Sequence, residues 1–435
     1  MTDTEERVEA ALERAAGEAT SLTGEDVAAV LRAGAVDAIQ IVARAFLEHV
    51  DDPDAVAGAV PAVAEVLEHH EEPRRGLAAT FLADLAVDHP GAVAAAADEL
   101  AAHLDDAPPV RGEAVRALAN VSKADAAAVR PAVDEVATAL RESGADVARD
   151  AAACLANVAR AAPGAVAPHL PALVDLISTE YEGIPERSPD SFDPASSEAY
   201  HQMRERDWET RREHGAARES AAEALLTVAR DRPDALVAER DALADIVRTA
   251  SVDETLRLTV EAVGAAAQDR PAVGEAAIDA LAARLAPEET DEQRPVAGTD
   301  REQALRGAAA WALGIVAEDA PAVVADAVVP RLPAVVELLE ADDTEVRARA
   351  VGLLSYVAES DPVATAQATD ALLARLDDES EAVRWGAATA LGYAGSERAR
   401  DRLADAAASD GSEAVREAAT AALERLDSAS GVEEE

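Results

Sequence analysis

The side chains best suited to catalysis or metal binding are the histidines and one cysteine. The histidines are His49, His69, His70, His89, His103, His169, His201 and His214. A histidine metal site needs further ligands at a regular spacing, and only His70 is followed directly by a carboxylate, Glu71. Because Cys154 is the only cysteine, an intrachain disulfide is excluded. It lies in the apolar run AAACLANVA, which predicts a buried side chain. Because glycine-rich phosphate loops are also absent, we expect no catalytic, cofactor-binding or metal site, and a protein that is not an enzyme.

Arginine, in contrast, recurs in a regular pattern. The arginines followed by alanine three residues later and leucine seven residues later are Arg75, Arg111, Arg218, Arg306, Arg347, Arg384 and Arg416. The aspartates that precede a Val-Arg pair in these segments are Asp106, Asp343, Asp378 and Asp410. An aspartate near a helix N-terminus accepts hydrogen bonds from free backbone N–H groups, and an arginine of a neighbouring segment can pair with it. The pattern therefore predicts a structural ladder of Asp and Arg contacts between successive segments.

A repeated pair of helices must position these arginines. Three further segments fit the register with the arginine replaced or displaced, and they centre on Leu47, Leu155 and Val263. Most neighbouring segments lie about 37 residues apart, which is enough for two helices and two turns. Apolar residues in 346–357 recur at intervals of three and four, as on one face of a helix. The sequence thus predicts an all-α fold, an α-solenoid superhelix of about ten helical hairpins.

This pattern resembles the HEAT repeat, including the short variant first known from phycobilin lyases, over roughly residues 35 to 427. The resemblance implies a protein-binding solenoid. One HEAT family, deoxyhypusine hydroxylase, binds iron through His-Glu pairs in several repeats, and this chain does not have those pairs. Armadillo repeats, which are related, bind extended peptides through asparagines that follow a tryptophan by four residues. Asn120 and Asn157 occupy the matching register, but Arg116 and Ala153 stand in the tryptophan positions, so this mode of binding is not expected.

Two interruptions of the repeat set the expected organisation of the chain. We expect N-terminal capping helices in 1–34 (roughly Thr4 to Ala19 and Glu25 to Ala33), HEAT-like repeats in 35–178, an insertion in 179–215, further repeats in 216–427 and an acidic tail in 428–435. A second insertion, at 287–299, interrupts the later repeats. Both insertions follow the first helix of a hairpin and precede the second, so they lie in turns along one edge of a solenoid.

The insertion at 179–215 is compositionally unlike the repeats and holds four of the ten aromatic residues. From Ser196 onward it predicts a helix, and one face of that helix would carry Tyr200, Met203, Arg204, Trp208, Arg211 and Arg212. Because Trp, Tyr and Arg dominate interface hot spots, we take Tyr200, Arg204, Trp208, Arg211 and Arg212 as the candidate protein-binding residues. The alternative is that the helix packs its rings onto the solenoid as a cover, and the sequence leaves both interpretations open.

The charge of the chain limits its partners. With 39 basic and 86 acidic residues the formal charge is −47, and Lys123 is the only lysine. Such a charge repels nucleic-acid phosphates and anionic lipid, so we expect neither nucleic-acid binding nor membrane insertion. The composition resembles that of haloarchaeal proteins, whose acidic surfaces stay soluble in high salt; an acidic protein of an ordinary cytoplasm is the alternative. The N-terminus MTDTEERVEA is not a signal peptide, which predicts a cytoplasmic protein.

The function that these features favour is a non-catalytic protein–protein interaction scaffold or adaptor. The alternative is an accessory or regulatory subunit of an enzyme or of a chromosome-organising assembly, as the HEAT subunits of condensin are. In both cases the partner is another protein. The sequence identifies neither that protein nor the oligomeric state of the chain.

Overall fold

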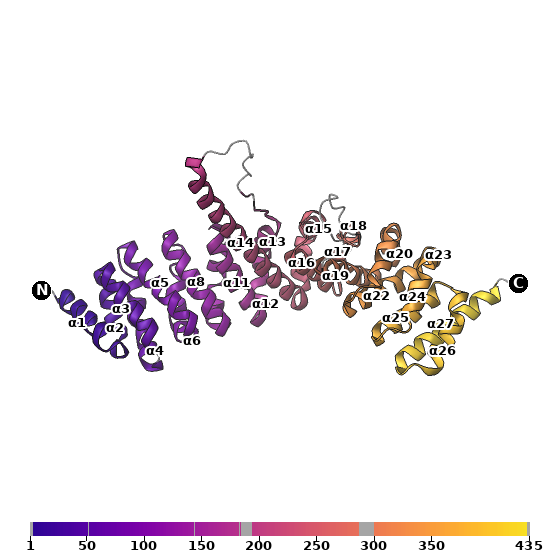
Figure 1. Cartoon of the computed structure of the whole chain (residues 1–435), viewed down its shortest axis with the longest axis horizontal. Helices are drawn as coiled ribbons and strands as arrows, with labels where there is room; N and C mark the ends of the chain where they lie inside the picture. The colour runs from indigo at the N-terminus through magenta and orange to yellow at the C-terminus, as the bar shows by residue number, and fades with distance from the viewer. Residues whose placement is uncertain are drawn as a thin grey trace. The chain divides into compact units, whose positions relative to one another are not determined.

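The structure, a computed structural model, describes residues 3–50, 52–142, 144–181, 183, 194–286 and 300–432. Within these residues the secondary structure is helical, with no strand (Figure 1). The chain divides into unit 1, Met1–Val228, and unit 2, Ala229–Glu435. Each unit is a row of antiparallel helical hairpins in which neighbours in sequence are neighbours in space, so the prediction of an all-α solenoid is confirmed.

Unit 1 begins with three helices and continues with hairpins. Its helices are α1 (Asp3–Gly17), α2 (Gly24–Ala33), α3 (Val36–His49), α4 (Pro53–Leu67), α5 (Glu72–Asp88), α6 (Pro90–Val93), α7 (Ala97–Ala101), α8 (Pro108–Ala124), α9 (Ala126–Val129), α10 (Val133–Glu142), α11 (Ala145–Ala161), α12 (Pro163–Val166), α13 (Leu170–Ser178) and α14 (Pro194–Asp231). Short 3₁₀ turns are η1 (Ala19–Ser21), η2 (Ala94–Ala96), η3 (Arg130–Ala132) and η4 (Ala167–His169). The unit boundary falls in the last turn of α14.

Unit 2 is built in the same way. Its helices are α15 (Arg240–Thr249), α16 (Glu254–Ala267), α17 (Pro271–Glu275), α18 (Ile278–Ala283), α19 (Asp300–Ala317), α20 (Pro321–Val328), α21 (Leu332–Leu338), α22 (Thr344–Ser360), α23 (Pro362–Thr365), α24 (Thr369–Arg375), α25 (Glu381–Tyr393), α26 (Arg400–Ser409) and α27 (Glu413–Val432). Its 3₁₀ turns are η6 (Pro233–Glu239), η7 (Val329–Arg331), η8 (Ala366–Ala368) and η9 (Glu397–Ala399).

The first helix of most hairpins is interrupted, whereas the second is continuous. Helices α9 and α10 are separated by η3, which contains Pro131, and α20 and α21 are separated by η7, which contains Pro330. Proline cannot donate the backbone hydrogen bond that a continuous α-helix requires, so the chain tightens into a 3₁₀ turn there. The second helices lack internal proline and stack on one another, α5 on α8 and α8 on α11 in unit 1, and α16, α19, α22, α25 and α27 in succession in unit 2.

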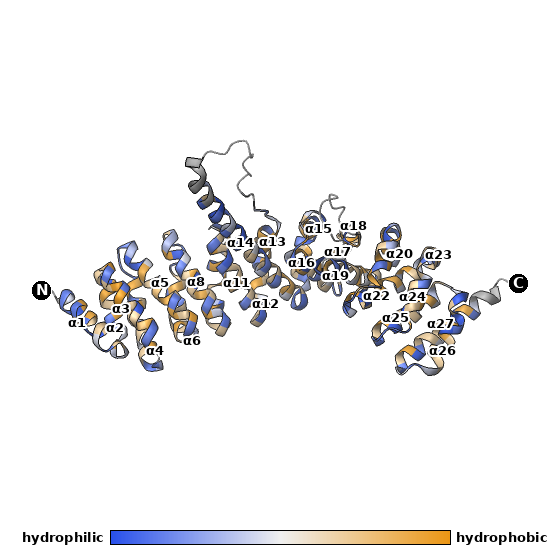
Figure 2. Cartoon of the chain, in the orientation of Figure 1, coloured by the Kyte–Doolittle hydropathy of each residue, from blue (hydrophilic) through white to orange (hydrophobic). Residues whose placement is uncertain are grey.

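The hydrophobic core lies between stacked hairpins. The repeat-marking residues Leu82, Leu118, Leu155, Leu225, Val263, Leu313, Leu354 and Leu391 are fully buried. The alanines that follow the ladder arginines, such as Ala78 and Ala350, are also fully buried, because their small side chains let the second helices approach closely. Figure 2 shows hydrophobic residues mainly where helices face one another and hydrophilic residues on the outer surfaces.

The N-terminal helices depart from the predicted register. Helix α2 makes the main contact with α4, while α3 packs on α1 and α2 and contacts α5 only lightly. Leu47, expected to mark the first repeat, is therefore half-buried, and Phe46 beside it is fully buried. Helices α1 to α3 thus form the N-terminal group together, so α3 is not the second helix of a regular hairpin.

Helix α14 corrects the predicted boundary at residue 215. The helix expected within the insertion and the repeat helix expected after it are one continuous helix of 38 residues. Residues 202–213 are mostly Arg, Glu, Gln and Met, which favour helix, and the helix runs through Gly215, where an added Cβ would meet no atom within 4 Å. The insertion therefore contributes an N-terminal extension of a repeat helix. We call residues 200–213 the α14 extension.

Candidate protein-binding site

The ladder arginines have a shared role that the sequence analysis missed. Each guanidinium donates to a backbone carbonyl at the end of the first helix of its own hairpin. The acceptors are His69 and His70 for Arg75, Asp106 for Arg111, Ile177 for Arg218, Leu285 for Arg306, Ala341 and Asp342 for Arg347, Asp378 and Glu379 for Arg384, and Asp410 for Arg416. The last carbonyls of a helix have no partner within it, and the helix dipole favours a cation there. These arginines therefore close their hairpins.

Arg75, Arg347 and Arg384 also reach an aspartate of the next hairpin. Both oxygens of each carboxylate accept a hydrogen bond, at 2.6 and 2.7 Å in the Arg75–Asp106 pair, 2.9 and 3.1 Å in Arg347–Asp378 and 2.8 and 3.1 Å in Arg384–Asp410. Such two-point pairing fixes orientation as well as distance. The expected link from one segment to the next is therefore present in these three pairs.

Arg306 and Asp343 show where the predicted ladder is wrong. Arg306 does not bond Asp343; it donates to the Ala334 carbonyl at 2.6 Å and to Glu337 at 3.2 Å. Asp343 instead caps α22 by accepting from the Glu345 N–H at 2.7 Å. At this point of the chain Asp343 caps the helix and Glu337 pairs with the arginine of the neighbouring hairpin, whereas the sequence pattern had assigned both roles to one aspartate.

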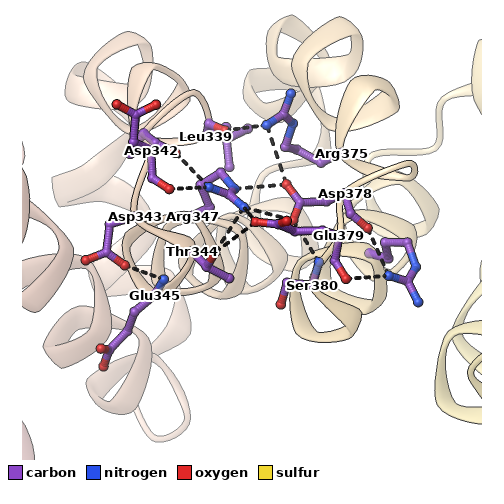
Figure 3. A network of polar contacts seen from close by, with 12 residues as sticks. Leu339, Asp342, Asp343, Thr344, Glu345, Arg347, Arg375, Asp378, Glu379 and Ser380 are labelled. Carbon is purple, nitrogen blue, oxygen red and sulfur yellow. Dashed lines mark hydrogen bonds and ion pairs between the residues drawn. The ribbon is translucent and has the colours of Figure 1, made fainter.

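The contact around Arg347 is the most buried of the three (Figure 3). The Arg347 side chain is 8% exposed and that of Asp378 is 4% exposed. Burial alone would raise the pKa of Asp378, but hydrogen bonds from Arg347 and from the Ser380 N–H outweigh it and hold that pKa below its ordinary value. At the equivalent pair in unit 1, the hydrogen bonds from Arg75 lower the pKa of Asp106 from 3.8 to about 2. Both carboxylates therefore stay ionised at neutral pH.

Two further arginines form hydrogen bonds between neighbouring hairpins, and the sequence analysis did not identify them. Arg284, which is buried, donates to the carbonyls of Val247 and Ala250 at 2.7 Å each, at the end of the first helix of the preceding hairpin. Arg375 donates in the same way to Leu339 at 3.0 Å (Figure 3). Both occur in the tripeptide Ala-Arg-Leu near the end of a first helix, which is the sequence signal that could have revealed them.

The α14 extension is held to unit 1 along one side. The Tyr181 hydroxyl donates to buried Asp207 at 3.0 Å, and His214 contacts the Thr179 carbonyl at 2.9 Å. Glu213 accepts from Arg149 of α11 at 3.2 Å. Two of the carboxylates in this region are therefore turned toward the rest of the unit and engaged there.

Another face of the α14 extension exposes Trp208 and Arg212, whereas Arg211, four residues after Asp207, lies on the anchored side. Trp208 is 59% exposed, and Arg211 and Arg212 are exposed, whereas Tyr200 and Arg204 are half-buried. The Arg212 guanidinium lies 5.2 Å from the centre of the Trp208 ring, and that of Arg211 lies 5.9 Å from the ring of Tyr181. The interpretation that the helix buries this ring face as a cover is thus wrong for Trp208. The loop at 287–299, expected beside this helix, lies outside the described residues.

The other polar residues singled out from the sequence have structural partners. Asn120 donates to the Ala83 carbonyl at 3.4 Å and Asn157 to the Ser122 hydroxyl at 2.9 Å, so each reaches the preceding second helix. Cys154 is buried, and burial raises the pKa of its thiol to about 12. Within the part of the chain that the structure describes, His, Cys, Asp and Glu side chains form no group of three or more suited to a metal ion.

Stacked two-helix hairpins with buried second-helix leucines define an α-solenoid repeat protein. Comparison with family models specifies the repeat: residues 332–424 match the model for HEAT repeats, and residues 304–357 match that for a HEAT-like repeat. Residues 304–424 are thus identified as HEAT repeats. A search of curated proteins found no match. Among the described helices, none has the length and apolarity needed to cross a bilayer.

Proposed function

We propose that this chain is a non-catalytic scaffold or adaptor that binds another protein through the α14 extension. HEAT repeats are commonly protein-interaction scaffolds, which supports the general class. The observation that carries the specific proposal is the exposure of Trp208 beside Arg212 on a helix whose neighbouring face is anchored through Asp207. A large apolar ring left in water is unfavourable unless it is covered by a partner, and Trp and Arg are the residues most often found at the centre of interfaces.

The anchoring contacts make this surface suited to binding. Because Asp207, Glu213 and His214 fix one side of the α14 extension to unit 1, Trp208 is held in place before a partner arrives. A pre-organised anchor loses less conformational entropy on binding than a mobile one. The charge of −47 favours a high-salt cytoplasm as the setting, where long-range repulsion between acidic proteins is screened and short-range contacts decide affinity.

Affinity capture at high salt tests the proposal. The wild-type chain, a Trp208→Ala variant and a chain with residues 182–212 replaced by a short Gly-Ser turn are used as bait, and Val87→Ala serves as a control because Val87 is 61% exposed on α5. We expect the same principal partner with wild type and the control, and its loss with the other two. The captured protein is then purified and its affinity measured directly, with at least a tenfold loss expected for Trp208→Ala. Unchanged affinity in folded Trp208→Ala would refute the proposal.

The same capture separates the scaffold from the alternative of an enzyme subunit. A stoichiometric partner with ATPase or other catalytic activity, whose activity changes when this chain is removed, would favour an accessory subunit. A partner that binds with no change in activity favours a scaffold.

A further inference from the structure

The outward faces of three stacked second helices in unit 2 gather aromatic side chains. Residues four apart lie on one face of a helix, and these positions hold Trp311 and Ile315 on α19, Gly352 and Tyr356 on α22, and Trp385 and Thr389 on α25. Trp385 is 45% exposed, and Trp311 and Tyr356 are half-buried. In a protein with so few rings, this concentration on adjacent helices marks a surface that differs from the rest of the repeat array.

A hollow of about 470 Å³ lies between α19 and α22. Its lining includes the rings of Trp311 and Tyr356 and the aliphatic side chain of Ile315, and it is bordered by Glu318, Glu345 and Arg349. Glu318 accepts a hydrogen bond from the Tyr356 hydroxyl at 3.2 Å. We call this the unit 2 hollow. Its volume lies in the range of sites that enclose a small molecule or a large side chain.

Glycines in the unit 2 hollow are not required by packing. An added Cβ at Gly314 or at Gly352 would meet no atom within 4 Å, whereas one at Gly264 would lie 2.5 Å from Trp311 and one at Gly386 would lie 2.7 Å from Val351. Glycine in the interior of a helix is destabilising relative to alanine. Gly264 and Gly386 are explained by close packing, but Gly314 and Gly352 are not. Their effect is to keep the floor of the hollow open.

The chemistry of this surface suits arginine and aromatic side chains together. The Arg349 guanidinium lies 5.8 Å from the centre of the Trp311 ring and pairs with Glu345 at 2.5 Å. Farther along, the Arg425 guanidinium lies 4.2 Å from the centre of the Tyr393 ring. The fold therefore already places guanidinium groups on ring faces and against carboxylates at this surface, an arrangement stabilised by cation–π attraction and by ion pairing.

We propose that the unit 2 hollow binds the α14 extension of a second copy of this chain. Trp208 would enter the hollow, and Arg212, whose guanidinium lies 5.2 Å from the centre of the Trp208 ring, would lie against Glu318. This inference rests on the proposed function, since it names a partner for the same exposed surface. Charge complementarity supports it: in a chain with 86 acidic and 39 basic residues, the exposed Arg212 beside Trp208 matches the Glu318 carboxylate at the border of the hollow.

The proposed contact joins the α14 extension of one copy to the unit 2 hollow of another, so every copy carries both surfaces. Interfaces of this kind either close into a ring or dimer or continue as an open chain. Two variants block one patch each. The extension variant is Trp208→Ala with Arg212→Glu, and the hollow variant is Gly352→Leu with Glu318→Arg. Val363→Ala is the control, because Val363 is 86% exposed on α23 and does not line the hollow.

Sedimentation equilibrium of the full chain in about 3 M KCl, over the micromolar range, tests the proposal, because long-range attraction is screened at that salt and specific short-range contacts remain. We expect wild type and Val363→Ala to associate as concentration rises, and each blocked variant, shown by circular dichroism to be folded, to associate at least tenfold more weakly. An equimolar mixture of the two blocked variants should form a heterodimer and no larger species, since each supplies one intact patch. A monomeric wild type, or association that survives in both variants, would overturn the proposal. A monomeric chain that still captures another protein through Trp208 would leave the proposed function intact.

Discussion

Replacing Arg347 by alanine should destabilise two neighbouring hairpins of unit 2. Its guanidinium donates to both oxygens of Asp378 and to the carbonyls of Ala341 and Asp342, each at 2.9 to 3.1 Å. The first contacts link one hairpin to the next, and the second close the hairpin that contains Arg347. A single truncation therefore removes a link within a hairpin and a link between hairpins (Figure 3).

The size of the effect follows from what remains around Asp378. Removing one partner of a buried ion pair costs about 3–5 kcal/mol, because the other charge is left in a poorly solvated position. Asp378 keeps the Ser380 N–H at 3.0 Å and the Arg375 guanidinium at 3.5 Å, which compensate part of the loss. We therefore expect about 3 kcal/mol for Arg347→Ala. Combining it with Asp378→Asn should restore part of that stability, since the unpaired charge is then absent.

Arg416→Ala is the matched control. Arg416 is half-buried and donates to the neutral Asp410 carbonyl at 2.7 Å, so its loss should cost about 1 kcal/mol. Native-state hydrogen exchange is the assay, because repeat arrays respond mainly between nearest neighbours. We expect Arg347→Ala to lose protection within residues 330–390, around α21, α22, α24 and α25. A uniform loss along the chain, or an effect no larger than that of Arg416→Ala, would refute the reasoning.

Three further predictions concern salt, acid and thiol reactivity. With a net charge of −47, helical content and melting temperature by circular dichroism should rise from about 0.1 M to about 3 M KCl, and a melting temperature independent of salt would contradict adaptation to high salt. The pKa of Asp106 falls from 3.8 to about 2 on folding, so its contribution to the free energy of unfolding is present above pH 4 and lost as the pH falls toward 2. The difference in unfolding free energy between wild type and Asp106→Asn, measured with urea, should therefore shrink by about 2 kcal/mol over that interval, and a constant difference would argue against the Arg75 pairing. Because burial raises the pKa of Cys154 to about 12, iodoacetamide at pH 8 should modify it only after unfolding, and rapid labelling of the folded chain would show that the site opens.

The repeat architecture was predictable because it depends on a pattern that every hairpin must satisfy. A second helix between two neighbours needs an apolar residue at the same position, so Leu118 and Leu354 are buried as their register predicts. At the ends of the array this requirement is weaker. Leu423 in α27, which has a repeat neighbour on one side, is half-buried although it has the same sequence register. Leu47 is half-buried as well, because α3 lies beside the stack.

Features that depend on a single contact were less predictable. Arg347 and Arg306 follow an aliphatic residue in similar segments, yet Arg347 reaches Asp378 while Arg306 reaches Glu337. Which carboxylate lies within reach depends on the length and direction of the next turn, and sequence periodicity does not report either. The sequence also does not reveal the hydrogen bonds from arginine to backbone carbonyls, because every residue has a backbone carbonyl and no side chain marks the acceptor.

Helix continuity in α14 was missed for a different reason. Gly215 and the change of composition near it suggested a boundary, since glycine weakens a helix. The residues before Gly215 are strong helix formers, and the residues after it are held by the stack, with Ala217 and Ala221 fully buried. Once both flanking segments are helical in the same direction, one glycine costs only about 1 kcal/mol, which is less than the cost of ending one helix and starting another.

The arginine that closes each hairpin explains why a turn can carry an insertion without disturbing the stack. Arg218 donates to the Ile177 carbonyl at 3.0 Å and Arg306 to the Leu285 carbonyl at 2.8 Å, although insertions lie between the two residues of each pair. These distances match the 2.9 Å between Arg347 and Ala341 in a hairpin with a short turn. Loop-closure entropy grows only slowly with length, by about 0.6 kcal/mol per doubling, so one retained contact offsets much of the added cost. Hairpin geometry is therefore set by the arginine and the helix end, and the segment between them is free to add new surface, such as the α14 extension with its exposed Trp208.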